Sequence, residues 1–243
     1  MQREQLTGEG GLSSESGADA GGRRGLLQNA LAAIDTLQAR LAAAEGALHE
    51  PIAIVGLSCR VPGGGVDGGS FWKILEEGRD VVGEVPPDRW DVPGYHDPAP
   101  GSDDKPVTRA GGFLAAVDEF DAAFFGISPR EARSMDPQQR LLLEAAWEAL
   151  ENAAIPPDSL SESLTGVFVG VTATDYARRI DVADPSRSDM YLATGTALNA
   201  AAGRISFLLG LQGPCMAIDT ACSSSLVAIH NACQSLRNRE SDL

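Results

Sequence analysis

Residues 213–230 read GPCMAIDTACSSSLVAIH, and this stretch contains the change of pattern that decides the fold. The apolar run 215–218 predicts a short strand that is buried on both faces. Small residues follow at 221–225, and the apolar spacing then becomes helical, at Leu226, Ile229, Ala232, Cys233 and Leu236. The stretch therefore predicts a strand, a tight turn and a helix, with Cys222 in the turn beside the helix N-terminus.

Two further apolar runs, 52–57 and 165–171, have the same character and predict two more buried strands. Helical segments lie between them. Residues 128–131 read SPRE, which is the form of a capping box with proline at the first helical position. Asp136-Pro137 repeats this form eight residues later, so a second helix is expected to start there and to end before Ile155. This alternation of strands and helices indicates an α/β fold with a mainly parallel sheet.

The N-terminal residues follow a different pattern. Residues 1–25 are rich in glycine and serine and predict a disordered leader. Residues 26–49 predict a helix, because apolar residues recur there with heptad spacing at Leu27, Ala30, Ile34, Leu37, Leu41, Ala44 and Leu48. The helix is either half of a short coiled coil that joins two chains, which we favour, or an amphipathic helix lying on the globular body. A coiled coil this short needs the support of a larger interface.

The composition excludes several classes of protein. Of the 243 residues, 19 are Lys or Arg and 34 are Asp or Glu, which gives a net charge of −15 and argues against a nucleic-acid partner. No apolar stretch approaches the ~18 residues of a membrane helix, and the N-terminus lacks the apolar core of a signal peptide. We therefore expect a cytoplasmic protein with four free thiols. Because the cysteines form no C-x-x-C pair, no structural zinc site is expected.

Cys222 is the candidate catalytic residue. A helix N-terminus stabilises a thiolate, a tight turn after a strand pushes the side chain outward, and free N–H groups at the turn can hold a developing oxyanion. From the residues alone an alternative stays open, since a serine-rich helix start can simply be a good cap and a cysteine can simply pack as a small apolar residue. For Cys59, Cys215 and Cys233 we expect this packing role.

The stretch 219–226, DTACSSSL, resembles the active-site cysteine motif of β-ketoacyl synthases, in the form found in modular type I polyketide synthases. Other stretches are similar to this family in the same order along residues 50–243. These are the opening strand and loop EPIAIVGLSCR (50–60) with PGG (62–64), the helical segments FFGISPREA (124–132) and MDPQQR (135–140), and AGRIS (202–206).

The resemblance implies a thiolase-like fold, a homodimer and a ping-pong reaction. An acyl group passes from the phosphopantetheine arm of an acyl carrier protein to Cys222. A malonyl-type extender on a second carrier then loses CO2, and the resulting carbanion attacks the thioester. No cofactor is bound directly. The residues that match the family from Glu50 to Leu243 imply the N-terminal half of such a synthase, preceded by the helix 26–49, which is expected to dock onto an upstream synthase polypeptide.

The resemblance also implies two catalytic histidines and a lysine in the second half of the domain. His230 lies eight residues after Cys222, or ~12 Å along a helix, which is too far to contact the thiol. His49 and His96 lie in the heptad helix and in the Pro/Gly/Asp-rich residues 85–112, which are expected to form a long surface excursion. We therefore expect the 243-residue chain alone to show no condensation activity. Two alternatives are a non-catalytic docking and dimerisation scaffold, and a synthase of the fatty-acid type.

Overall fold

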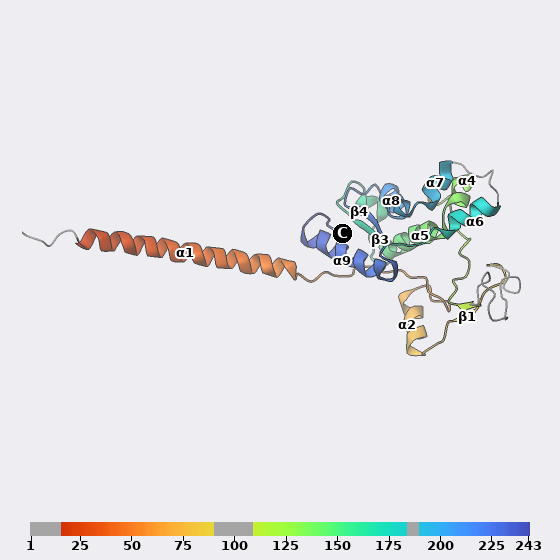
Figure 1. Cartoon of the computed structure of the whole chain (residues 1–243), viewed down its shortest axis with the longest axis horizontal. Helices are drawn as coiled ribbons and strands as arrows, with labels where there is room; N and C mark the ends of the chain where they lie inside the picture. Colours follow the sequence, from red (N-terminus) through yellow and green to blue (C-terminus); the bar gives the residue numbers. More distant parts are fainter. Residues whose placement is uncertain (1–15, 90–108, 184–189) are drawn as a thin grey trace, which may run out of the picture. The chain divides into compact units, whose positions relative to one another are not determined.

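A computed structural model describes residues 16–89, 109–183 and 190–243, which form two compact units, Met1–Pro51 and Ile52–Leu243. The first unit contains the helix α1 (Ser16–Leu48). The second unit is α/β, as predicted (Figure 1). Its elements in chain order are α2 (Gly68–Glu76), β1 (Gly83–Glu84), β2 (Ala110–Gly111), α4 (Pro129–Ser134), α5 (Pro137–Asn152), η1 (Pro157–Leu160), β3 (Val167–Gly170), α6 (Asp175–Ala183), α7 (Met190–Thr196), α8 (Leu198–Leu209), β4 (Cys215–Ile218), η3 (Ala221–Ser223) and α9 (Ser224–Arg237).

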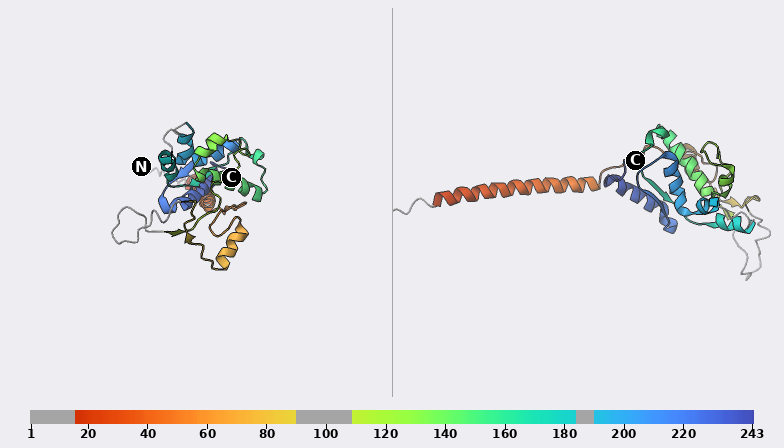
Figure 2. Two further views of the ribbon diagram at one scale, coloured as in Figure 1. Left: turned by 90° about the vertical axis from the view of Figure 1, so that its right-hand side faces the viewer. Right: turned by 90° about the horizontal axis from the view of Figure 1, so that it is seen from above.

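The helix α1 is longer than the heptad pattern predicts. It is continuous from Ser16 to Leu48 (Figure 2), so residues 16–25, which were predicted to be disordered, are helical. Once a helix has formed, each further residue that joins it adds one backbone hydrogen bond. The helix can therefore extend through a glycine-containing segment. The rest of the predicted leader, residues 1–15, lies outside the described residues.

A parallel pair of strands forms the centre of the second unit. β3 and β4 pair in register from Val167 opposite Cys215 to Gly170 opposite Ile218. Both strands were predicted, and they run in the same direction because the chain returns through helices between them. The pair continues past the strand ends, where the Val171 N–H donates to the carbonyl of Ile218 at 3.1 Å.

Helices α8 and α9 cover opposite faces of this strand pair. Successive side chains of a strand point to opposite faces, and Val167, Val169 and Val171 pack into one buried cluster with Ile205 of α8. Gly170 faces the other way, where the first turn of α9 lies against it. The order of the layers is therefore α9, the strands, α8 and then α5, which packs against α8.

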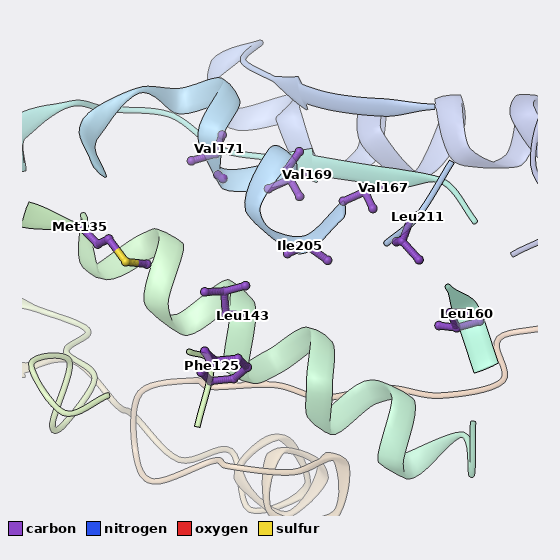
Figure 3. Close-up of a cluster of buried hydrophobic side chains, with 11 residues drawn as sticks. Phe125, Met135, Leu143, Leu160, Val167, Val169, Val171, Ile205 and Leu211 are labelled. Carbon is purple, nitrogen blue, oxygen red and sulfur yellow. The ribbon is translucent and has the colours of Figure 1, made fainter. Parts of the chain in front are cut away.

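The hydrophobic core lies between β3, α8 and α5 (Figure 3). Met135, at the junction of α4 and α5, is completely buried in it, and Leu143 of α5 is nearly so. The two helices start as predicted, because the Ser128 hydroxyl accepts from the Glu131 N–H at 3.2 Å and Asp136 accepts from the Gln138 N–H at 2.8 Å. The core thus packs together α5, α8 and β3, which all precede the Cys222 turn in the chain.

The prediction of a buried strand at residues 52–57 is wrong. The segment has no strand structure, and the side chains of Ile54, Val55 and Leu57 are exposed. It lies along α5, where the Leu57 N–H donates to Asn152 Oδ1 at 3.0 Å. An apolar run becomes a strand only where a second strand offers its backbone for pairing, and a helix side chain takes that place here.

The predicted surface excursion, residues 85–112, falls mostly outside the described residues. At its base, β1 and β2 form a two-residue antiparallel ladder, in which Gly83 pairs with Gly111 and Glu84 with Ala110. The Val85 N–H extends this pairing by donating to the carbonyl of Arg109 at 3.0 Å. The ladder therefore joins the two ends of the excursion.

Two glutamates one turn apart on α5 have opposite pKa shifts. Glu148 accepts from Arg60 Nη1 at 2.7 Å, with a second bond to Nη2, and from the Ser58 hydroxyl at 2.6 Å. The hydrogen bonds from Arg60 are the main reason why the pKa of Glu148 is lowered. At Glu144, burial is the main reason why the pKa is raised. The positive charge of Arg60 opposes this effect, and the negative charges of Glu148 and Asp121 add to it.

These shifts predict opposite effects of two matched substitutions. Glu148→Gln is expected to lower the free energy of unfolding at pH 7 by about 1 kcal/mol, a small value because the ion pair is partly exposed. Glu144→Gln is expected to raise it, since a neutral amide avoids the cost of burying a charge. Urea unfolding of both variants from pH 7 to pH 3 measures the two differences.

The pH dependence follows from the direction of each shift. The stability from ionised Glu148 is present above its unfolded pKa of about 4.3 and is lost as the pH falls through its lowered folded pKa. As the pH falls through the raised pKa of Glu144 towards about 4.3, protonation removes the free-energy cost of burying its charge. Both variants should therefore approach the wild type in acid. Two differences of the same sign at pH 7 would contradict this account.

Candidate active site at Cys222

Cys222 lies in the turn between β4 and α9, as predicted. The turn is the single 3₁₀ turn η3, and α9 begins directly after it at Ser224. The thiol side chain is exposed and unpaired. A strand that ends in a tight turn before a helix thus presents Cys222 at the helix N-terminus, beside the positive end of the helix dipole.

The backbone of this turn is strained at the residue before the cysteine. Ala221 has a φ of +55°, in the left-handed region that residues with a Cβ rarely adopt. Its N–H donates to Asp219 Oδ1 at 3.0 Å. Left-handed residues persist only where surrounding contacts hold them, and they are common at reactive turns. The strain shows that the contacts of the turn hold Ala221 in place.

The serines shape the turn and do not cap the helix. Ser223, the N-cap residue of α9, makes no side-chain capping bond. Its hydroxyl instead bonds to the Thr220 carbonyl at 2.9 Å and to the Thr220 hydroxyl at 2.8 Å. The Ser224 hydroxyl is also used inside the turn, with the Thr220 N–H and the Ala221 carbonyl as partners. The alternative in which this serine run is only a good cap is therefore not supported.

A close backbone contact sets the position of the turn on the sheet. A Cβ on Gly170, the last residue of β3, would lie 2.7 Å from the Ser225 nitrogen and 2.8 Å from the carbonyl carbon of Ser224. These distances are far below van der Waals contact, so α9 can approach β3 this closely only because residue 170 has no side chain. The small residues Ser224, Ala228 and Ser235 are the buried ones on α9.

One of the three other cysteines does not have the predicted packing role. Cys59 and Cys233 are half-buried, whereas Cys215 is exposed, which corrects the prediction that it packs inside a buried strand. β4 has β3 on one side and no second neighbouring strand within the described residues, so its first residues stay open to solvent. Partial burial of the sulfur nevertheless raises the pKa of Cys215, and a hydrogen bond with Ser206 opposes this shift.

No histidine of this chain was predicted to be a catalytic partner of Cys222. His230 lies on α9 and is exposed. His49 follows α1 and belongs to the first unit, and His96 lies outside the described residues.

Sequence reasoning missed the residues that shape the turn, which are Gly170, Asp219, Ala221 and Ser224. One signal was available, because an isolated glycine in a strand often marks a close approach of another backbone. The left-handed conformation of Ala221 has no such signal, since alanine is not a residue typical of that region.

Comparison with known proteins agrees with this fold. Residues 49–243 match the family model described as "Beta-ketoacyl synthase, N-terminal domain". The chain is 56% identical over 199 residues to one polypeptide of the phenolphthiocerol/phthiocerol polyketide synthase of Mycobacterium tuberculosis, covering 80% of this chain and 11% of that protein. It is 55% identical over 198 residues to another polypeptide of the same synthase, covering 81% of this chain and 13% of that protein.

Solved ketosynthases have the same fold. The oxazolomycin ketosynthase domain of Streptomyces albus superposes with a TM-score of 0.72 at 40% identity, covering 79% of this chain and 33% of that one. The module 6 ketosynthase of the bacillaene synthase of Bacillus subtilis gives a TM-score of 0.67 at 37% identity, covering 78% and 30%.

The second unit therefore has the fold of a ketosynthase N-terminal domain, which is thiolase-like. The chain belongs to the β-ketoacyl synthase family, as the motifs indicated. It spans between a tenth and a seventh of the length of the curated relatives described above. Among the described residues, no helix is long and apolar enough to cross a membrane.

Proposed function

We propose that this chain is part of a ketosynthase domain of a modular type I polyketide synthase, with Cys222 as the residue that carries the growing acyl chain. The observation that carries the proposal is the exposed Cys222 on a strained turn at the N-terminus of α9. Family membership and identity to polyketide synthase polypeptides support this chemistry. A fatty-acid type of synthase uses the same site chemistry and is the second candidate.

The proposed reaction has two half-reactions. First, the sulfur of Cys222 attacks the acyl thioester on the phosphopantetheine arm of an acyl carrier protein, and the pantetheine thiol leaves with a proton. The C–C bond then forms when a malonyl-type thioester on a carrier loses CO2 and its carbanion attacks the Cys222 thioester. The cysteine sulfur leaves and regains a proton. We expect N–H groups at the N-terminus of α9 to stabilise the oxyanion in each step.

Selective alkylation of Cys222 tests this proposal. In the folded 243-residue chain, iodoacetamide is expected to modify Cys222 at least about tenfold faster than Cys215, because the turn places only Cys222 at a helix N-terminus. Cys215 is an exposed internal reference. Because burial of its sulfur raises the pKa of Cys215, the rate of Cys222 is also compared with its own rate in the urea-unfolded chain. Peptide mass spectrometry over a time course measures each rate.

Two controls make the alkylation result decisive. Cys222→Ser should remove the fast-reacting site and leave modification of Cys215 unchanged. Unfolding the chain in urea should bring the rates of all four thiols together, because the helix N-terminus is then lost. If Cys222 and Cys215 react equally fast in the folded chain, Cys222 is not an activated nucleophile and the proposal fails.

We also propose that α1 joins two chains as a short coiled coil and docks onto an upstream synthase polypeptide. Its side chains Leu27, Ile34, Leu37 and Leu41 are all exposed. A single helix cannot bury its own apolar stripe, and residues 16–51 contain no second element that covers it. A second α1 offers the matching a and d positions, and the homodimer implied for the family would bring the two helices together.

Disruption of the heptad tests the role of α1. Substituting Ile34→Asp and Leu41→Asp together is expected to shift the chain from dimer towards monomer, because charges at a positions oppose coiled-coil pairing. Sedimentation equilibrium across a range of concentrations measures this shift. Asp35→Ala, one residue from the stripe, is the control. An unchanged association constant for the double variant would show that α1 does not contribute to dimerisation.

A further inference from the structure

The hydroxyl of Ser224 bridges the peptide group before Thr220 and the peptide group after Ala221. It accepts from the Thr220 N–H at 2.9 Å and donates to the carbonyl of Ala221 at 2.7 Å. Ser224 is only 5% exposed, whereas its neighbours Ser223 and Ser225 are exposed. This is a two-bond contact within the buried side of the turn, and water has little access to replace it.

The bridge acts on the conformation of the turn. Ala221 is held at a φ of +55°, which alanine leaves for the right-handed or extended regions when nothing opposes that change. Such a rotation would break the contact between the Ser224 hydroxyl and one or both of its partners. The Asp219 carboxylate holds the Ala221 N–H from the solvent side, but it lies on an exposed residue. The buried hydroxyl is therefore the stronger constraint on Ala221.

The backbone of Ser224 is held as well. Its carbonyl carbon and the Ser225 nitrogen lie against Gly170 at the end of β3. The hydroxyl thus connects a point fixed on the sheet to the peptide groups that precede Cys222. Because the backbone of Ser224 is fixed against the sheet and its hydroxyl is bonded to the carbonyl of Ala221, Ser224 can hold Cys222 at a fixed position relative to the sheet.

We propose that Ser224 is the positioning residue for Cys222. It acts through Ala221 and does not touch the substrate. The inference rests on the proposed function, because it assigns to Ser224 the task of holding the nucleophile at the N-terminus of α9. Without the hydroxyl, Ala221 relaxes, the first turn of the helix reorganises, and Cys222 loses its place beside the helix N–H groups.

Ser235 provides a matched control on the same helix. It is 2% exposed, and its hydroxyl is bonded to the buried Ser241 hydroxyl at 3.0 Å. Ser235→Ala removes a buried hydroxyl from α9, as Ser224→Ala does, but eleven residues further along the helix. The two variants should therefore lose similar stability, and only one of them should change the turn.

The experiment compares the rates of Cys222 and Cys215 with iodoacetamide in the wild type, Ser224→Ala and Ser235→Ala. In Ser224→Ala the ratio of the Cys222 rate to the Cys215 rate is expected to fall about tenfold, towards its value in urea. In Ser235→Ala the ratio should stay at the wild-type value. Urea unfolding of each variant confirms that the comparison is made on folded chains.

The outcomes separate this inference from the proposed function. If the wild-type ratio is high and Ser224→Ala leaves it unchanged, the positioning role is overturned and the proposed function stands. If the wild-type ratio is near one, the proposed function itself fails. If Ser224→Ala does not fold, amide hydrogen exchange of the wild type decides. Protection of the Thr220 N–H supports the bridge, and exchange at the rate of an unstructured peptide overturns it.

Discussion

Gly170→Ala is expected to destabilise the second unit by about 3 kcal/mol, the upper part of the usual range for overpacking. The added Cβ would lie within 2.8 Å of three backbone atoms of Ser224 and Ser225. Backbone atoms at the start of a helix cannot rotate away as a flexible side chain can, so α9 must shift as a body. Gly170 has no left-handed φ, which means that the effect is steric and not conformational.

The same substitution is expected to impair the site. A shift of about 1 Å in a reacting group can cost about 100-fold in rate, and α9 carries the turn that contains Cys222. We therefore expect the fast alkylation of Cys222 to be lost in Gly170→Ala while Cys215 reacts as before. Urea unfolding and the alkylation time course measure the two effects on the same protein.

Gly203→Ala is the control for Gly170→Ala. Gly203 lies inside α8, and a Cβ there would have no atom within 4 Å. Because alanine is the better helix former, this variant is expected to gain about 0.5–1 kcal/mol. Wild-type stability and alkylation in Gly170→Ala would show that α9 does not approach β3 as closely as described.

Met135→Ala is expected to lower the free energy of unfolding by about 2–5 kcal/mol. Met135 has no exposed surface and packs in the cluster with Leu143 and Val169. Its truncation leaves a cavity at the junction of α4 and α5, where the Met135 carbonyl also accepts from Arg140 Nε at 3.0 Å and Nη2 at 2.7 Å. Urea or thermal unfolding at neutral pH measures the loss.

Two controls accompany this prediction. Met190→Ala, on the 78% exposed methionine of α7, is expected to change stability by no more than about 0.5 kcal/mol. Met135→Leu, which keeps most of the volume, should cost less than about 1.5 kcal/mol. Equal losses in Met135→Ala and Met190→Ala would contradict the position of Met135 in the core.

Local patterns predicted the elements whose signals are contained within a few residues. β4 and the start of α5 at Pro137 were predicted to the residue, and β3 lies inside the predicted run 165–171. Caps, proline at the first helical position and short apolar runs act through neighbouring residues, so no tertiary contact is needed to recognise them. The strand-turn-helix around Cys222 belongs to this group.

Structural features that depend on residues far away in the chain were predicted less well. Residues 52–57 have the composition of a buried strand but lie along α5, because the side chain of Asn152 takes one of their backbone hydrogen bonds. On α9 the large residues Leu226 and Ile229 are exposed, while the small ones face the sheet. A helix that approaches a strand at a glycine leaves room only for small side chains, and its own periodicity does not reveal this.

The sequence by itself determined the class of fold, the family and the cysteine that carries the proposed chemistry, since these depend on local patterns and on motifs in a fixed order. Only the tertiary structure decided how Cys222 is held. The contact at Gly170 joins residues about fifty positions apart in the chain, and the left-handed Ala221 and the short-range bridge from Ser224 lie in the turn that this contact positions. The physical reason is steric: whether a backbone is strained or a glycine is required depends on which atoms the fold brings against it.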